Sequence, residues 1–464
     1  MFVLERDSGI PLPSQVAARI RSLIVDGTLR AGDPVSSSRG LARDLGVSRG
    51  TVVAAYDQLI AEGYLATRPG GTTTVHPDAL QAGREPFPAR VDRPAHGGER
   101  GLCDTRSRPE NSAHDDGAII DMRPGFSHDE VAEDSTWREA WRSAAGTAGA
   151  KGDVRGLRVT RVAISEHLRL TRSMQVDPED IVVTGGARDG LFALLSCVGE
   201  LGLRRCLAIE NPGYPGLRGV IRRSGIDAVD IVTELPAEAG AALVTPNRTY
   251  PLGGSMPAGE RMELLASAER QRCLIIEDDL DSQFRHVGPV MPSLWELAPG
   301  SVAHLGTFNQ VLTRQVRLGY IILSQDIQGP ILAFRQDLGM IPSAIAQRAL
   351  ATYLETGGLR RSLARRRREV IRRRRIINEA LAWADVRMNA EATAIVRLGR
   401  SEADWVAAEC ATNGVLVETL GTYWSGGAEA GIVFSYGRGS NDVLTRGLAC
   451  IRSALEEDAA IVEP

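Results

Sequence analysis

The stretch that decides the fold is His304–Tyr320, which reads HLGTFNQVLTRQVRLGY. A short apolar run, Ser301–Leu305, leads into Gly306, and a polar segment follows. That segment ends at Arg317 and leads into a second apolar run, Ile321–Ser324. Short apolar runs bounded by glycine and polar residues are typical of buried strands. The stretch therefore predicts two strands joined by a loop that carries polar side chains.

Helix and strand patterns alternate around this stretch from residue 118 to about 460, which is typical of an α/β domain. Its last part, about 384–460, reads as a small α/β subdomain. A buried strand begins at Leu274 and ends in carboxylates that include Asp278. Ligands of α/β proteins bind at the carboxyl ends of strands, so we expect a pocket there. A solvated strand end is the other interpretation.

Residues 8–75 form a separate compact unit. Apolar residues recur at helical spacing, and glycine-containing turns separate the helices. The predicted helices and β-rich runs cover residues 11–27, 39–45, 49–62, 64–68 and 72–75. Three helices followed by a two-stranded wing form the winged helix-turn-helix layout.

The third predicted helix carries Ser48, Arg49 and Thr51 at its N-terminal end. That end enters the major groove in helix-turn-helix proteins, and short hydroxyls and arginine suit phosphates and base edges. The unit therefore predicts binding to double-stranded DNA. A small helical module that binds proteins is the alternative interpretation.

Residues 76–117 are rich in proline, glycine, arginine and aspartate, with few apolar residues and no period. This composition predicts a flexible linker. Its length would let the DNA-binding unit of one subunit cross over to a partner subunit.

The composition of the 464 residues is that of an ordinary multidomain globular protein, with 43% hydrophobic and 24% charged residues. The net charge of −4 gives no global attraction to nucleic acid, so DNA must meet a local patch. Nearly all the positive charge is arginine, as in proteins from GC-rich genomes, and Lys151 is the one lysine. Six scattered cysteines and no long apolar run predict a cytoplasmic protein without disulfides, metal sites or membrane segments.

The chain resembles the MocR/GabR branch of the GntR-family regulators from about residue 11 to about residue 455. The resemblance rests on SSSRGLARDLGVSRGTVVAAYDQLIAEGYL at 36–65, NPGYPG at 211–216 and GTFNQ with RLGY within 306–320. It implies an N-terminal winged helix-turn-helix and an α/β fold-type I domain like that of transferases dependent on pyridoxal phosphate (PLP). It also implies a domain-swapped homodimer. By resemblance, the DNA contacts come from Arg39, Ser48, Arg49, Thr51 and the wing near Gly70.

In that family a lysine holds PLP as a Schiff base, and an arginine holds its phosphate. Here Arg317 is kept, but Gln310 stands at the lysine position, and a glutamine amide is not nucleophilic. Leu280 replaces the tyrosine that holds the ring hydroxyl, and Arg248 and Thr249 replace a histidine and a glutamine. We therefore expect no catalytic residues, and PLP either bound without a covalent bond or absent.

The resemblance carries over these ligand-pocket positions: Lys151, Gly186, Ala187, Arg188, Tyr214, Asp278, Leu280, Gln310 and Arg317. In the family the aspartate pairs with the ring nitrogen, and the glycine-rich turn holds the phosphate on backbone N–H groups. Lys151 takes the place of a tyrosine that reaches the phosphate from the partner subunit. It either completes a pocket for a phosphate- or carboxylate-bearing effector or is a surface residue without consequence.

Two functions compete. The first is a DNA-binding transcriptional regulator whose aminotransferase-like domain serves for dimerisation and ligand sensing. The alternative is a working PLP-dependent aminotransferase with a fused DNA-binding domain. Transamination needs an amine that binds the cofactor and moves the α-proton, which Gln310 cannot supply. The family often has an arginine for an amino-acid carboxylate near Val433, and Arg438 lies close in the sequence. The missing amine favours the regulator.

Residues 358–375 predict a helix with ten arginines and one glutamate. Leu359, Leu363, Val370 and Ile371 are expected to face inward. The arginines then form either a plain solvated face or a patch that guides DNA.

Overall fold

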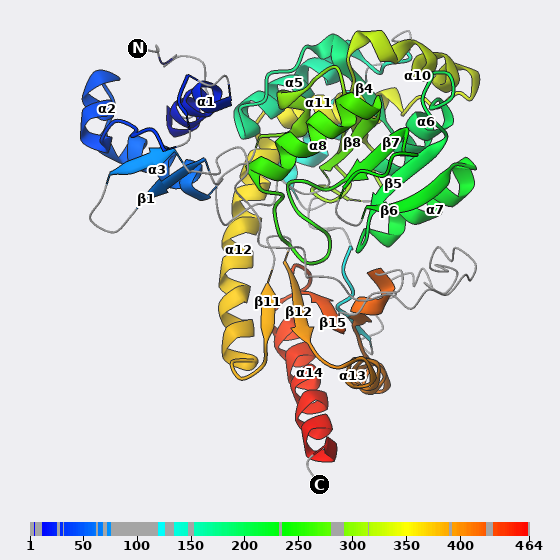
Figure 1. Cartoon of the computed structure of the whole chain (residues 1–464). Helices are drawn as coiled ribbons and strands as arrows, with labels where there is room; N and C mark the ends of the chain where they lie inside the picture. The colour runs from blue at the N-terminus through cyan, green and yellow to red at the C-terminus, as the bar shows by residue number, and fades with distance from the viewer. Residues whose placement is uncertain are drawn as a thin grey trace.

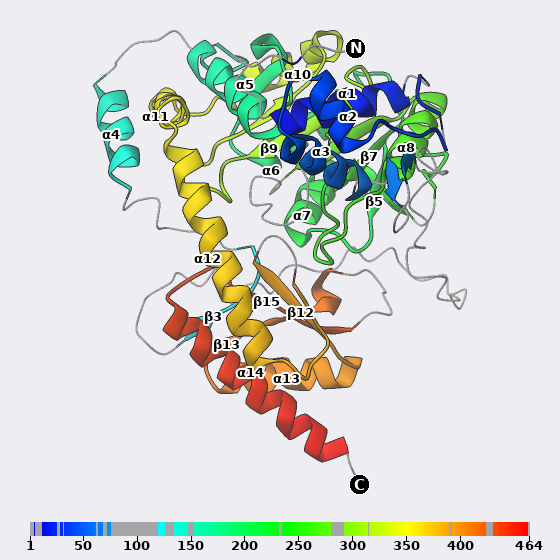
Figure 2. The same ribbon diagram turned by 90° about the vertical axis from the view of Figure 1, so that its left-hand side faces the viewer.

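The computed structural model describes residues 4, 12–25, 28–30, 32–61, 64–67, 72–75, 119–125, 134–146, 153–231, 234–279, 292–313, 315–388, 392–423 and 430–462. The predicted linker, 76–117, lies outside these ranges, and so do the predicted site residues Gly70, Lys151 and Leu280. Figure 1 shows a small N-terminal unit beside a large α/β domain, with a C-terminal subdomain below. Helix α12 (Gly358–Ala380) runs from the large domain into the subdomain (Figures 1 and 2).

The N-terminal unit is the predicted winged helix-turn-helix. Its elements are α1 (Leu12–Val25), α2 (Ser38–Asp44), α3 (Arg49–Ala61), β1 (Leu65–Thr67) and β2 (Thr73–Val75). The two strands pair antiparallel, with Leu65 opposite Val75. Val16, Ile20 and Val52 are buried between the helices, as their helical spacing predicts.

Serines fix the start of α2 and its distance from α3. Ser37 precedes α2, and its hydroxyl accepts a hydrogen bond from the backbone N–H of Gly40 at 3.1 Å. The Tyr56 hydroxyl on α3 donates to the backbone carbonyl of Ser36 at 2.5 Å. A run of serines before an apolar-periodic segment is typical of a helix cap, and Ser37 provides it. The hydrogen bond from Tyr56 ties α3 to the start of α2.

The large domain is built on a seven-stranded sheet of order β4-β10-β9-β8-β7-β5-β6. Strands β5 to β9 pair in parallel, and β10 runs antiparallel to both β4 and β9. The strands are β4 (Ile181–Thr184), β5 (Cys206–Glu210), β6 (Asp227–Ile231), β7 (Ala241–Val244), β8 (Leu274–Asp279), β9 (Val302–Thr307) and β10 (Gly319–Ile322). Parallel strands that are covered on both faces read as continuous apolar runs, which explains the sequence of β7 and β8.

Helices cover both faces of this sheet. One hydrophobic core lies under α4 (Ser135–Ala145), α5 (Arg158–Arg172), α8 (Ala258–Gln271), α9 (Leu294–Leu297) and α11 (Ala344–Glu355). The other lies under α6 (Ala187–Ser196), α7 (Pro215–Ser224) and α10 (Gln325–Asp337). The alternation along β8 sends Ile275 to the first core and Ile276 to the second.

The C-terminal subdomain is a four-stranded sheet of order β11-β12-β15-β14. The four strands are β11 (Val386–Met388), β12 (Thr393–Arg397), β14 (Glu418–Thr419) and β15 (Gly431–Ser435). The subdomain also contains α13 (Arg400–Thr412), β13 (Val415–Leu416) and α14 (Asn441–Val462). The first described residues after the linker return to it, because β3 (Ile120–Asp121) pairs in parallel with β13. Met122 is buried in the core of the subdomain.

Helix α12 only partly follows its prediction. Leu359 and Leu363 are buried as expected, but Ile371 is 42% exposed, so its predicted inward position is wrong. Most of the arginines are exposed, as both interpretations of the helix require, but Arg366 and Arg373 are buried and belong to neither. The cause is local geometry: α12 passes between two domains, so different sides of the helix are covered along its length.

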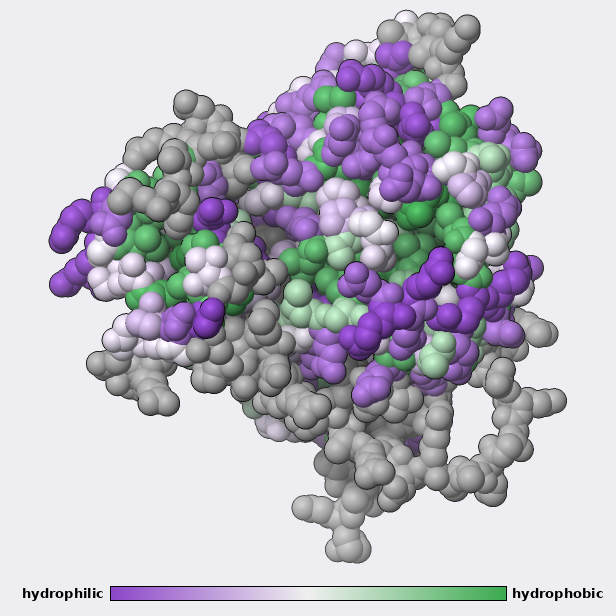
Figure 3. Space-filling model, turned by 45° about the horizontal axis from the view of Figure 1, so that its top comes forward, coloured by the Kyte–Doolittle hydropathy of each residue, from purple (hydrophilic) through white to green (hydrophobic). Residues whose placement is uncertain are grey.

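Apolar side chains reach the surface near the ends of α5, α10 and α11. Figure 3, in which the upper end of Figure 1 comes forward, shows apolar patches among hydrophilic side chains. The exposed large apolar residues of these elements are Val159, Val162, Leu338, Ile341 and Ile345. Exposed apolar side chains of this size do not stabilise an isolated subunit, so this surface is a candidate site for binding a partner.

Candidate functional site

The start of α3 brings three predicted DNA contacts together. Ser48 precedes the helix, and its hydroxyl accepts from the backbone N–H of Thr51 at 3.1 Å. The two hydroxyl oxygens also lie 2.9 Å apart, within hydrogen-bond distance. Arg49 is exposed beside them, and Arg39 is exposed in the first turn of α2. Ser48 therefore caps the helix while Arg39 and Arg49 face solvent.

The deciding stretch forms the predicted strand, loop and strand. Gly306 of β9 pairs with Tyr320 of β10, and the ring of Tyr320 fills the space where a Cβ of residue 306 would lie. Only glycine is accommodated there. Gln310 lies half-buried in the loop, whereas Arg317 is exposed, with a φ of 52°. Arg317 has no hydrogen bond or ion pair with any residue that the structure describes.

The first turn of α6 meets this loop. Gly186 precedes the helix with a φ of 106°, and a Cβ added to it would lie 2.6 Å from Nδ2 of Asn309. Asn309 is held in place because its Oδ1 accepts from the backbone N–H of Leu318 at 3.2 Å. No side chain caps α6, so the backbone N–H groups of Ala187 and Arg188 remain available to an anion.

Asp278 stands at the carboxyl end of β8 and is buried, with 3% exposure. Neither carboxylate oxygen has a hydrogen-bond partner among the described residues. Burial, followed by the nearby carboxylates of Glu210 and Glu277, raises the pKa of Asp278 to about 8. The residue therefore holds a proton at neutral pH, and it can exchange hydrogen bonds with a ligand that carries a ring nitrogen.

A pocket lies beside Asp278. Glu210, Tyr214, Arg218 and Thr245 line it together with apolar side chains of β5, β7 and α7. The Glu210 carboxylate accepts from the backbone N–H of Thr245 at 3.0 Å and from its hydroxyl. Burial raises the pKa of Glu210 to about 7, although these two hydrogen bonds lower it. The pocket thus combines two protonatable carboxyl groups with a tyrosine ring.

Three tyrosines connect this pocket to the C-terminal subdomain. The ring centroids of Tyr214 and Tyr250 are 5.3 Å apart, and those of Tyr250 and Tyr423 are 5.4 Å apart, both edge to face. Val433 is buried in the same cluster. An apolar valine contributes no charge there to bind an amino-acid carboxylate.

The other two carboxylates of β8 face away from the pocket, and sequence reasoning missed their role. Asp279 forms a buried ion pair with Arg172, and Nδ1 of His304 lies 3.0 Å from the carboxylate of Glu277. Burial acts to raise the pKa of Glu277, but His304 and Arg172 lower it to about 2. Strand alternation was the available signal, since residues 277 and 279 lie on the face opposite Asp278.

A chain of polar contacts runs from β8 to α8. The Asn247 amide donates to Asp279 at 2.8 Å, and Arg261 on α8 donates to Asn247 Oδ1 at 3.2 Å. Arg261 is fully buried and also donates to the carbonyls of Met256, Pro246 and Pro292. Ala258, which lies one helical turn before Arg261 in α8, is part of the hydrophobic core of the winged helix unit. The end of β8 is therefore connected to the surface on which that unit packs.

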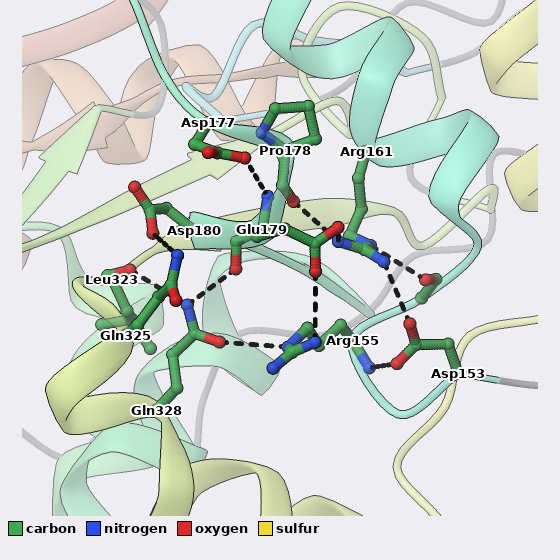
Figure 4. Close-up of polar contacts among 11 residues, drawn as sticks. Asp153, Arg155, Arg161, Asp177, Pro178, Glu179, Asp180, Leu323, Gln325 and Gln328 are labelled. Atoms are coloured by element: carbon green, nitrogen blue, oxygen red, sulfur yellow. Dashed lines mark hydrogen bonds and ion pairs between the residues drawn. The ribbon is translucent and has the colours of Figure 1, made fainter.

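The segment after Lys151 is held by the polar contacts of Figure 4. The Arg161 guanidinium, 2% exposed, donates to Asp153 at 3.0 Å, to Glu179 at 2.9 Å and to the carbonyl of Pro178 at 2.8 Å. Arg155 adds contacts to Glu179 and Gln328, both at 3.2 Å. The segment from Asp153 to Arg155 is thus joined to α5, to the turn Pro178–Asp180 before β4, and to α10.

A winged helix-turn-helix carried by a fold-type I domain defines a class, that of transcription regulators built on an enzyme fold. Residues 12–75 match the family described as "Bacterial regulatory proteins, gntR family". Residues 126–438 match "Aminotransferase class I and II".

Similar regulators span almost the whole chain. It is 38% identical, over 96% of each chain, to the HTH-type pyridoxine biosynthesis transcriptional regulator PdxR of Corynebacterium glutamicum. It is 32% identical to the probable rhizopine catabolism regulatory protein MocR of Rhizobium meliloti, over 81% of this chain and 78% of that protein. The chain therefore belongs to the MocR/GabR-type regulators of the GntR family. The expected fold class and the expected function, a DNA-binding transcriptional regulator, are confirmed.

Solved structures support the fold of the large domain. An archaeal alanine:glyoxylate aminotransferase superposes with a TM-score of 0.63 at 21% identity, over 73% of this chain and 91% of the enzyme. An aminotransferase from Mycobacterium tuberculosis also gives 0.63, at 16% identity, over 74% and 93% of the two chains. Within the described residues, no helix is long and apolar enough to cross a membrane.

Proposed function

We propose that the aminotransferase-like domain of this regulator holds a small phosphorylated pyridine, such as PLP, without a covalent bond and does not catalyse transamination. The observation that carries the proposal is Asp278, a buried carboxyl group that has no partner among the described residues and lies beside a pocket. A buried polar group without a partner is costly, and a ligand with a ring nitrogen would satisfy it.

The residues present fit such a ligand. Asp278 would pair with the ring nitrogen, Tyr214 would contact the ring, and the first turn of α6 would hold the phosphate. When bound, PLP supplies an electron-withdrawing ring. Arg317, which is exposed, would add positive charge on the phosphate side, and so would Lys151 if it takes the position that the family resemblance implies. The name of PdxR links one relative to pyridoxine biosynthesis, which also favours a ligand of this class.

The same residues argue against transamination. Gln310 stands at the position of the lysine, and the single lysine of the chain is Lys151. The buried Val433 leaves no cation at the place expected for a substrate carboxylate. We infer that this protein retains the ligand pocket of the fold without the amine that performs its chemistry.

DNA binding by the winged helix unit would use the exposed Arg39 and Arg49, the helix-capping Ser48, Thr51 and the wing near Gly70. Arginine side chains at the start of a recognition helix reach base edges and phosphates. A regulator that acts on chromosomal DNA works in the cytoplasm.

The regulator would act as a homodimer. The apolar group formed by Val159, Val162, Leu338, Ile341 and Ile345 offers a surface for a second copy. Gln347 ties α11 to the start of α5, because its side chain accepts from the backbone N–H of Leu157 at 2.7 Å. The starts of the two helices therefore lie side by side. Exchange of the winged helix units across the linker, residues 76–117, would make the dimer domain-swapped.

Calorimetric titration of the purified protein with PLP tests the proposal. We expect reversible binding that dialysis removes. Asp278→Asn should lose at least about tenfold in affinity, since an amide cannot transfer a proton to the ring nitrogen and form a charged pair with it. Alanine and a keto acid added with PLP should give no product. Steady product formation would support the aminotransferase alternative, and the absence of any binding would refute the ligand pocket while leaving DNA binding intact.

A further inference from the structure

Helix α12 carries two kinds of arginine. Arg366 is buried and donates to the backbone carbonyl of Val311 in the large domain at 2.7 Å. Arg373 is buried and donates to the carbonyls of Tyr436 at 3.0 Å and Gly439 at 2.6 Å in the subdomain. These two guanidinium groups join α12 to its neighbours, so they are unavailable to a partner molecule.

Arg360 and five further arginines of α12 are exposed. The five form a line, which we call the arginine stripe: Arg361, Arg365, Arg368, Arg372 and Arg375. Their spacing of four, three, four and three residues keeps them on one side of the helix. At 1.5 Å per residue the stripe is about 21 Å long.

Little in the described part of the chain neutralises this stripe. Arg365 pairs with Asp134 at 3.1 Å, and Arg361 donates to a backbone carbonyl. The side chains of Arg368, Arg372 and Arg375 have no hydrogen bond or ion pair with any described residue. The glutamate within this part of the helix, Glu369, pairs with the buried Arg373 at 3.1 Å and so does not offset the exposed charge.

Helix α12, which carries the stripe, also lies on the side of the molecule that carries the DNA-binding unit. In Figure 1 both α12 and the winged helix unit form the left side, and in Figure 2, where that side faces the viewer, both lie in front. The net charge of the chain is −4, so this line of positive charge is a local feature.

We propose that the arginine stripe binds the phosphate backbone of duplex DNA outside the part contacted by the winged helix unit. DNA presents a negative charge about every 1.7 Å of its axis, so a stripe of this length can meet several phosphates. Guanidinium groups bind phosphate through two parallel hydrogen bonds, which suits a backbone contact without sequence specificity. The regulator would thus bind DNA through α12 as well as through its helix-turn-helix.

The test compares two triple variants of the full-length protein that change the charge equally. The first is Arg368→Glu/Arg372→Glu/Arg375→Glu in the stripe. The second is Arg205→Glu/Arg223→Glu/Arg270→Glu, three exposed arginines outside α12. Binding to an 80-base-pair duplex of mixed sequence would be measured by fluorescence anisotropy over a range of KCl concentrations, with gel filtration and circular dichroism to confirm folding.

Each phosphate contact contributes about 0.9 to the slope of the logarithm of the DNA-binding constant against the logarithm of the KCl concentration. The stripe variant should therefore lose about 2–3 units of slope. It should also bind the duplex at least about tenfold more weakly at low salt. The control variant should change the affinity less than about threefold. The milder Arg→Gln triple in the stripe should lose slope in the same way. An unchanged slope for both stripe variants, or an equal loss in the control, would overturn the proposal.

Discussion

Asp278 and Asp279 are consecutive on β8, yet they serve opposite faces of the sheet. Asp279 forms a buried ion pair with Arg172, whereas Asp278 has no hydrogen-bond partner among the described residues and lies beside the pocket. One peptide unit therefore separates a structural carboxylate from one that is available to a ligand. The predictions below follow from this separation and from the two binding surfaces of the protein.

The protonation of Asp278 should make stability depend on pH. Its pKa is raised from 3.8 to about 8, so between these values the folded protein binds a proton that the unfolded chain does not. Stability must then fall as the pH rises from about 4 to about 8, and this contribution levels off above that range. Asp278→Asn should flatten the plot of Tm against pH over this window and raise Tm by several degrees above it. Asp404→Asn, at an exposed position on α13, is the matched control and should follow the wild type.

Restoring the amine should restore covalent binding. With PLP added, Gln310→Lys should gain the visible absorbance of a Schiff base, and borohydride reduction followed by peptide mapping should place the adduct at residue 310. The wild type, treated in the same way, should show no stoichiometric adduct. An adduct at Lys151 in the wild type would contradict non-covalent binding, because it would show that the Schiff base has moved.

Arg49 should matter for specific DNA binding. Arg49→Ala should weaken binding to a duplex selected in vitro by about 1–3 kcal/mol, because it removes an exposed guanidinium from the start of α3. Mobility shifts at matched salt measure the effect. Arg223→Ala on α7 removes the same charge elsewhere. Equal losses in the two variants would refute a role for Arg49 at the interface.

The buried ion pair of Arg172 should be essential for folding stability. Arg172→Met leaves the charge of Asp279 buried and uncompensated, and we expect a loss of about 3–5 kcal/mol in urea unfolding. Arg452→Met breaks an exposed pair with Glu456 on α14 and should cost less than about 1 kcal/mol. Similar losses for both variants would mean that the buried pair contributes little.

The apolar surface on α5, α10 and α11 should support the dimer. Ile341→Asp/Ile345→Asp places two carboxylates on it and should shift the sedimentation coefficient from dimer to monomer. Trp383→Asp changes an apolar side chain that is also exposed, at 54%, but lies in the C-terminal subdomain, and it should leave the dimer intact. A double variant that sediments as a dimer would exclude this surface as the interface.

The sequence predicted the elements that depend on residues close together in the chain. The serine cap at Ser37, the apolar run of β8 and the glycine before the polar loop all formed as their patterns indicate. The sequence did not predict the burial of Arg366 and Arg373, because their partners are backbone carbonyls of segments far away in the chain. A run of arginines reads as solvated until those carbonyls are known.

The candidate site was predictable where it depends on strand ends and helix starts. Gly186, Tyr214 and Asp278 lie on such elements, and the fold places all three at the carboxyl edge of the sheet. The different roles of Glu277, Asp278 and Asp279 could have been inferred from strand alternation, but a single acidic run conceals them. The roles of Lys151 and Leu280 remain predictions, since both lie outside the described residues.

The position of Ala258 bears on how the regulator measures DNA. Because this residue of the large domain is buried in the core of the winged helix unit, the unit packs against a large domain. In a dimer, the distance between the two recognition helices then depends on how the large domains associate, whether each unit packs on its own subunit or on the partner. The association of the enzyme-like domains therefore determines the spacing of the operator half-sites that the regulator can bind.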